Sequence, residues 1–392
     1  MGDQLFPVAV AALVVGRGGS AGDLGFILAA RFAALVLFAL LGGAWSDRLP
    51  RVRVLQAADV LRLVAVSGLA VVAVAGEPGV AVLAMLVFVV GAGEAFSRPA
   101  YGALLPAVLP DAALPAANAM SGVSLHVASI AGPGVAGALL LVVSPSVVFA
   151  LDAVTFAISF ATLLRVAEPA AVRVARRRLR REVAEGFGAV RARPWLGAVL
   201  AMTAVQMVVV VAPVTVLLPV VLRDDVLADP ADASAAYGLV LALGAVGGLV
   251  GALAAGRWQP ARPGTVALLL ACGFAAAPLS LLVGAPVPGI ALAWFVAMAG
   301  LGPFNVWWET ALQRAVPREL LARVVSVDWM CSLALLPLGL ALTGPLVALV
   351  GRGPLLVTGA VVLVATALLA LQVRGVPGLA LPVAAEEGTA TP

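Results

Sequence analysis

Long apolar runs separated by short polar connections make up almost the whole chain. Most runs hold about 20 residues, the length at which a helix crosses a bilayer core of roughly 30 Å. The runs cover residues 1–15, 24–45, 54–75, 80–97, 119–143, 146–166, 196–220, 236–256, 264–284, 290–308, 326–350 and 353–373. None of them shows the strict alternation that is typical of a membrane strand. The pattern predicts an all-α integral membrane protein with twelve transmembrane helices.

The first run is shorter than the others. From Leu5 to Val15 it holds 11 apolar residues before Gly16 and Arg17. At about 1.5 Å per residue, this covers roughly half of the bilayer core. We expect the first helix to be truncated at its start by on the order of ten to fifteen residues, which would place Asp3 inside the membrane. The alternative is a genuine half-helix in a locally thinned bilayer.

The positions of the basic residues give the chain an orientation. All 24 basic residues are arginine, against 20 acidic residues and one histidine. Most arginines fall in connections on one side of the predicted membrane, whereas only Arg17, Arg223 and Arg352 fall in connections on the other side. The positive-inside rule therefore predicts a multi-pass plasma-membrane protein with both termini in the cytoplasm. The same rule accounts for the basic charge, so we expect no binding to nucleic acid.

A long polar stretch divides the chain into two halves. Residues 1–166 form the predicted N-terminal six-helix bundle, 167–195 a basic cytoplasmic linker, 196–373 the C-terminal six-helix bundle, and 374–392 a cytoplasmic tail. The linker, "AEPAAVRVARRRLRREVAEGFGAVRARPW", is expected to hold an amphipathic helix on the inner leaflet. The halves are themselves similar, because "ALLPAVLPDAALPAANAMS" (Ala103–Ser121) is echoed by "ALQRAVPRELLARVVS" (Ala311–Ser326).

Several function classes lack the residues that they require. A nucleotide-binding loop of the GxxxxGK[ST] type needs a lysine, and the chain has none. A metal centre or an enzyme site needs clustered His, Cys, Asp or Glu, and the single histidine and the isolated Cys272 and Cys331 form no such cluster. We expect no enzymatic activity, cofactor or metal ion. The expected partners are a small-molecule substrate, protons and the lipid bilayer, and the protein is expected to be a monomer.

The connection between the second and third predicted helices carries a family signature. The sequence "GAWSDRLPRVR" resembles the signature of the major facilitator superfamily, with Gly43, Asp47, Arg48 and Arg51 at matching positions and Pro50 where glycine is usual. The resemblance implies that Asp47 contacts a helix N-terminus in the other half, as a conformational latch. The alternative is a loop whose arginines only set the orientation.

Further stretches resemble drug–proton antiporters and one branch of the superfamily. "ASIAGPGVAGALL" resembles the antiporter motif through Gly132, Pro133 and Gly137, although ordinary small-residue packing stays an alternative. "FSRPAYGALLPAVLPDAALPAANAMSG", "FALDAVTFAISFATLLRV" and "LQRAVPRELLARVVSVD" resemble exporters of macrolides and of siderophores such as enterobactin. The resemblance implies two six-helix bundles around a central cavity that export a small hydrophobic or amphipathic molecule by proton antiport. The alternative is an importer or facilitator of a small metabolite.

Ionisable residues within the apolar runs are candidates for proton coupling, because charges in a bilayer are costly. Glu94 is one candidate, with a pairing to Arg98 as the alternative. Asp59 and Arg62 lie three residues apart and either neutralise each other or take part in coupling. Asp3 joins these candidates if the first helix is truncated. Two further charged residues within the runs, Arg31 and Asp152, are assigned to structural networks with unknown partners.

The expected cavity lining is apolar and aromatic. The candidate substrate contacts in the seventh and tenth predicted helices are Met202, Gln206, Trp294, Met298 and Asn305. Adaptable methionine and flat aromatic side chains suit greasy substrates. Packing against lipid or against other helices is the alternative role of these side chains.

The topology can be tested by cysteine labelling. In a background without Cys272 and Cys331, the variants Arg17→Cys and Arg51→Cys should react with a membrane-impermeant reagent from opposite sides. Labelling of both positions from the same side would contradict the twelve-helix topology.

Overall fold

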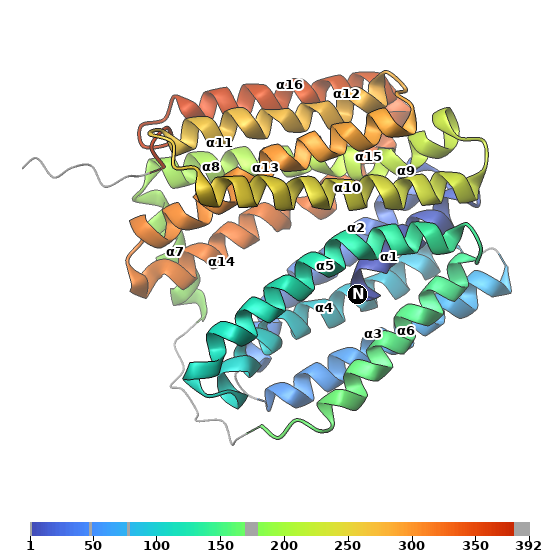
Figure 1. Ribbon diagram of the computed structural model, residues 1–392, viewed down its shortest axis with the longest axis horizontal. Helices are drawn as coiled ribbons and strands as arrows, with labels where there is room; N and C mark the ends of the chain where they lie inside the picture. The colour runs from blue at the N-terminus through green and yellow to red at the C-terminus, as the bar shows by residue number, and fades with distance from the viewer. Residues whose placement is uncertain (1, 47–48, 77–78, 169–178, 380–392) are drawn as a thin grey trace, which may run out of the picture.

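The computed structural model describes residues 2–46, 49–76, 79–168 and 179–379. Within these residues, 11 helices are long and apolar enough to cross a membrane, and a shorter apolar helix, Gly2–Val15, precedes them. The helices form two bundles that lie side by side (Figure 1). The all-α fold is the one that the apolar pattern predicts.

The N-terminal bundle is built from the shorter helix α1 and the first five long helices. They are α1 (Gly2–Val15), α2 (Ala21–Ser46), α3 (Arg51–Ala75), α4 (Val80–Val108), α5 (Leu114–Leu140) and α6 (Pro145–Leu163), with the short turn η1 (Asp111–Ala113) before α5. α4 continues for 11 residues beyond the apolar run that predicted it. Helix propagation needs only backbone hydrogen bonds, so a helix can extend past the end of its apolar segment.

The C-terminal bundle contains several interrupted helices. Its elements are α8 (Pro194–Gln206), η2 (Met207–Val211), α9 (Ala212–Val221), η3 (Leu222–Val226), α10 (Pro230–Arg257), α11 (Pro263–Ala271), η4 (Cys272–Ala275), α12 (Ala276–Leu282), α13 (Val287–Ala315), α14 (Arg318–Ala334), α15 (Leu336–Val350) and α16 (Arg352–Leu371). Interruptions precede Pro213, Pro278 and Pro337. Proline lacks the N–H that would bond to the carbonyl four residues earlier, so the regular ladder is broken there.

The linker helix α7 (Leu179–Arg191), which the sequence predicts as an amphipathic helix, packs against the C-terminal bundle. Glu185 forms an ion pair with Arg323 of α14, with Oε2 and Nη1 2.6 Å apart. The backbone at Gly186 lies so close to α14 that a methyl carbon there would be 2.9 Å from the Arg323 carbonyl oxygen. The linker helix therefore docks on the C-terminal bundle.

The two bundles touch through glycines at one end of the molecule. A methyl carbon on Gly238 of α10 would lie 2.3 Å from the carbonyl oxygen of Pro133 in α5. A methyl carbon on Gly344 of α15 would lie 2.2 Å from the Cα of Gly22 in α2. Small residues let helix backbones approach closely, which is the main source of helix association in lipid. We call this the closed end.

The bundles diverge towards the opposite end, where α7 and α14 lie (Figure 1). None of the residues of α5 before Ala128 is buried, whereas Gly132, Pro133 and Gly137 of the same helix are buried. Trp294 and Asn305 share one face of α13, since 11 residues make about three turns; Trp294 is 4% exposed and Asn305 is exposed. The facing surfaces are thus covered at the closed end and uncovered at this open end.

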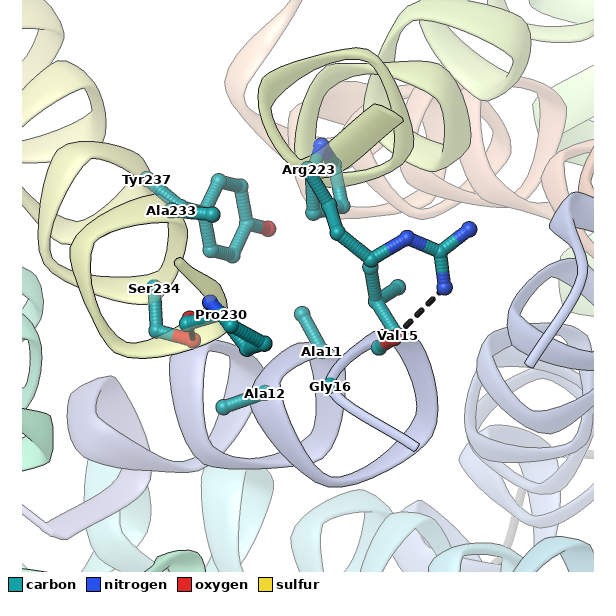
Figure 2. A pocket seen from close by; sticks show the side chains of 10 residues that line it. Ala11, Ala12, Val15, Gly16, Arg223, Pro230, Ala233, Ser234 and Tyr237 are labelled. Atoms are coloured by element: carbon teal, nitrogen blue, oxygen red, sulfur yellow. Dashed lines mark hydrogen bonds between the residues drawn. The ribbon is translucent and has the colours of Figure 1, made fainter. Parts of the chain in front are cut away.

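A cross-bundle contact at the closed end involves the last turn of α1. Arg223 of η3 donates hydrogen bonds to the carbonyl oxygens of Val15 at 2.5 Å and Gly19 at 3.2 Å. Figure 2 shows this arginine beside a small pocket that is lined by α1, α9, η3 and α10. Arg223 is held by Asp224, which also binds Arg352. A cation at a helix C-terminus is favourable, so the C-terminal bundle caps and fixes α1.

The glycine contact should control closure of this end. Gly238→Ala places a methyl carbon against backbone that cannot move aside, and we expect the closed end to separate. Double electron–electron resonance between spin labels at Leu141, directly after α5, and Asp232 of α10 should report longer distances.

Gly256→Ala in the same helix is the matched control, because no atom lies within 4 Å of the added methyl carbon. Identical distance distributions in the two variants would contradict the role of the glycine contact.

Candidate functional site

Charged side chains gather inside the N-terminal bundle, where α1, α2, α3, α4 and α6 meet. We call this set the N-bundle charge cluster; its members are Asp3, Arg31, Asp59, Arg62, Glu94, Arg98 and Asp152. Asp59 is 2% exposed, Arg62 and Glu94 are 6% exposed, and Asp152 is 1% exposed. Charges that are buried in this way need partners within the protein, because lipid offers them no solvation.

Glu94 is held between two arginines from different helices. Its Oε2 accepts hydrogen bonds from Arg31 Nη2 at 2.9 Å and Nε at 3.2 Å, and its Oε1 accepts one from Arg98 Nη2 at 2.6 Å. α2 and α4 approach closely at this point, since a methyl carbon on Gly91 would lie 2.3 Å from the Arg31 carbonyl oxygen. Arg31 also packs over the ring of Phe6, 5.1 Å from its centroid. Glu94 therefore joins α2 to α4.

Asp59 and Arg62 form a second buried pair within α3. Arg62 Nη2 donates to Asp59 Oδ1 at 2.7 Å, and Ser159 of α6 donates to the other oxygen of Asp59 at 2.6 Å. The Arg62 guanidinium lies 4.5 Å from the centroid of the Phe156 ring. Its Nη1 also donates to Asp3 of α1 at 3.4 Å. A single arginine thus connects α1, α3 and α6.

The remaining two acids of the cluster differ in their access to solvent. The side chain of Asp3 is 46% exposed, whereas Asp152 of α6 is 1% exposed. Asp152 Oδ1 accepts a hydrogen bond from Thr155 Oγ1 at 3.3 Å. Sequence reasoning gave Asp152 no functional role, although Thr155 and Ser159 follow it along one face of an apolar helix. That polar stripe is the signal that could have identified it.

The latch signature lies at the open end of the N-terminal bundle. Gly43 belongs to α2, and Asp47 and Arg48 lie outside the described residues. Arg51 begins α3, and its Nη1 donates to Glu168 Oε1 at 3.3 Å. Glu168 also accepts from the backbone N–H of Val52 at 3.0 Å, so it caps α3. In this conformation Arg51 contacts the start of the linker.

The antiporter-like residues of α5 lie where three helices meet. A methyl carbon on Gly132 would lie 2.4 Å from Gln4 Cβ, so Gly132 packs against α1. Pro133 and Gly137 pack against Gly238 of α10. The motif therefore lies at the contact between α1, α5 and the C-terminal bundle.

The cavity candidates have different surroundings. Met202 is buried in a hydrophobic core of the C-terminal bundle, and Gln206 donates a hydrogen bond to Thr366 Oγ1 of α16 at 2.9 Å. Trp294 and Met298 pack against Gly244 of α10. Asn305 is the exposed member of the set and lies towards the open end. Among the described residues, no group of three or more His, Cys, Asp or Glu could hold a metal ion.

Comparison with known proteins gives the same fold and efflux-type relatives. The chain is 29% identical to the multidrug efflux pump Tap of Mycobacterium tuberculosis over 388 residues, which cover 95% of this chain and 90% of that protein. It is 28% identical to macrolide efflux protein A of Enterococcus faecalis over 306 residues, or 76% of this chain and 93% of that protein.

Among solved structures, the nucleoside transporter NupG matches with a TM-score of 0.71 at 12% identity, covering 94% of this chain and 96% of its own. A bacterial homologue of the iron transporter ferroportin, in an inward-facing state, matches with a TM-score of 0.70 at 16% identity, covering 95% and 94%. The model of the Major Facilitator Superfamily matches residues 1–339. The chain therefore belongs to the Major Facilitator Superfamily.

Proposed function

We propose that this transporter exports a small hydrophobic or amphipathic molecule across the plasma membrane, by alternating access and in exchange for protons. The relatives named multidrug and macrolide efflux proteins support the export direction and the substrate class. The observation that carries proton exchange is the N-bundle charge cluster, in which buried carboxylates and arginines are bonded to the exposed side chain of Asp3. Intramembrane ionisable groups of this kind mark ion and proton pathways.

The orientation follows from the arginines. The open end carries the basic connections, including Arg257, Arg262 and the linker helix, and the positive-inside rule assigns it to the cytoplasm. The end of α16 is then cytoplasmic, whereas Gly2 lies inside the N-terminal bundle against Asp152. The conformation is closed to the outside and open to the cytoplasm, which is the state in which an exporter takes up its substrate.

The cluster is placed so that a change of charge acts on the contact between the bundles. A change in the charge of the cluster would alter how Glu94 holds Arg31 and Arg98. Arg31 belongs to α2, and the same helix packs on α15 of the other bundle at Gly22. Arg62 bonds to Asp3 of α1, and Asp59 accepts a hydrogen bond from α6. This second pair therefore connects α3 to α1 and to α6. Protonation therefore changes the packing of helices that form the closed end.

The latch residues have their role in the opposite conformation. When the open end closes, the connection after α2 approaches the C-terminal bundle, and Asp47 can meet a helix N-terminus there. Gly43, Arg48 and Arg51 position this connection. The bond from Arg51 to Glu168 belongs to the cytoplasm-open state, in which the latch is released.

The substrate path runs between the bundles, along the shared face of Trp294 and Asn305. Trp294, covered here, becomes accessible when the closed end opens, whereas Asn305 is exposed now. Met298, Met202 and Gln206 belong to the adjoining walls. An importer of a polar metabolite would need more free polar side chains along this path, and the amide of Gln206 is already bound to Thr366.

Glu94→Gln should abolish the use of a proton gradient while leaving substrate binding in place, because an amide keeps the shape but removes one negative charge from the cluster. With one proton exchanged per neutral substrate, a pH difference of about one unit supports a roughly tenfold substrate gradient. The variant should reach no gradient in proteoliposomes loaded with fluorescent lipophilic dyes.

Asp111→Asn is the matched acid-to-amide control, since Asp111 is exposed and lies outside the cluster. Normal uphill pumping by Glu94→Gln would contradict a coupling role for Glu94. Uphill movement of polar metabolites instead of the dyes would favour the importer.

Asp47→Ala should leave insertion intact but slow the transport cycle, because it removes a contact made in one state only. Arg53→Ala, at the neighbouring base outside the matched positions, is the control. A wild-type initial rate from well-expressed Asp47→Ala protein would leave the connection with an orientation role alone.

A further inference from the structure

Among the described residues, Asp152 is the acid of the N-bundle charge cluster that has no cation bonded to it. Arg31 and Arg98 bind Glu94, and Arg62 binds both Asp59 and Asp3. Asp152 Oδ1 accepts only the Thr155 hydroxyl, and its buried Oδ2 has no hydrogen-bond partner among the described residues. A carboxylate buried in this way is strongly disfavoured unless it is paired or neutralised.

The charge balance of the cluster is short of one positive charge. Four carboxylates face three arginines, so the fully ionised cluster carries one excess negative charge. One bound proton removes this excess. The three paired carboxylates gain from staying ionised beside their arginines, and Asp152 has no such gain.

The structure places Asp152 next to Asp3, the acid of the cluster whose side chain is exposed. The backbone of Gly2 lies directly on it, since a methyl carbon there would be 2.0 Å from Asp152 Oδ1 and 2.3 Å from Thr155 Oγ1. Asp3, the next residue of α1, acts electrostatically on Asp152 and has a side chain that is 46% exposed. Asp3, which is exposed and follows the Gly2 contact, is therefore placed to pass a proton to Asp152.

We propose that Asp152 holds the proton that this transporter exchanges for substrate, and that Asp3 passes it between Asp152 and water. In the transfer, the O–H bond of the Asp3 carboxylic acid breaks and an O–H bond forms on Asp152. The negative charge moves from Asp152 to Asp3, and no other reactant is needed. The proposal rests on proton exchange as the function and assigns the residue that carries the proton.

The neighbours of Asp152 determine the direction of the effect. The charged groups that face it are Asp3 from α1, Arg31 from α2, and Arg62 from α3, where Arg62 also holds Asp59. α5 carries a single titratable residue, His126, which is exposed. An ionised Asp152 repels Asp3 and attracts the arginines away from their present partners. Loss of the proton therefore loosens the packing of α1 on α6.

α1 transmits this change to the closed end. The helix contacts Asp152 at Gly2 and is held by Arg223 at Val15 and Gly19. Protonated Asp152 keeps α1 in the position that the outer closure requires, and ionised Asp152 favours opening. This direction of the effect suits an exporter. A proton taken up from the outside would close the outer end and return the protein to the cytoplasm-open state.

The first test uses the distance between spin labels at Leu141 and Asp232, and it needs neither a substrate nor a gradient. In the otherwise unmodified protein, the closed state should prevail at low pH, and longer distances should appear as the pH rises. Asp152→Asn, which mimics the protonated acid, should remain closed throughout, and Asp111→Asn should keep the pH response. A pH response in Asp152→Asn equal to that of the unmodified protein would overturn the proposal.

The second test is infrared spectroscopy of protein labelled with carbon-13 at the aspartate carboxyl. At neutral pH the unmodified protein should show a carboxylic-acid band that shifts with the label, and Asp152→Asn should lose it. Gly2→Ala should shift the band, whereas Gly197→Ala, with no atom within 4 Å of its methyl carbon, should not.

Absence of a label-sensitive acid band in the unmodified protein would overturn the proposal even if Asp152→Asn failed to fold. Both tests are independent of transport. If the unmodified protein failed to use a proton gradient, the exchange function would be wrong, while the protonation of Asp152 would still be decided.

Discussion

Neutralisation of buried charge is the constraint on which the N-terminal bundle depends. A bilayer offers charged groups no solvation, so each one inside it must find a partner in the protein or lose its charge. The pairs formed by Glu94 with Arg31, and by Asp59 with Arg62, satisfy this constraint and also join four different helices through their shared neighbours. The proton coupling that we propose would therefore depend on the same contacts that stabilise the bundle.

Glycine contacts determine which conformation the bundles adopt. Without a hydrophobic driving force between helices in lipid, association depends on close packing, and Gly238 and Gly344 provide it by removing the side chain at the point of contact. These contacts lie at the closed end, whereas the exposed first half of α5 and Asn305 mark the open end. Reversal of this asymmetry would give the outward-open state.

α1 takes part both in the neutralisation of buried charge and in the close packing between the bundles. It packs on α6 through Gly2, on α5 through the Gln4–Gly132 contact, and on the C-terminal bundle through Val15 and Arg223. A helix with contacts to both bundles can convert a local change of charge into a change of bundle contact. This provides physical coupling between sites without any long chain of intermediate residues.

The sequence by itself determined the membrane class, the helix count, the two-part plan and the family, because apolar length and arginine placement are local properties. It also identified Glu94, Asp59 and Arg62, since a charge within an apolar run is visible without a structure. Pairing was decided only by the tertiary structure: Arg31 meets Glu94 from a separate helix, and no cation in the described part of the chain is bonded to Asp152. Such partners depend on how helices distant in sequence pack and rotate against each other, which no local pattern encodes.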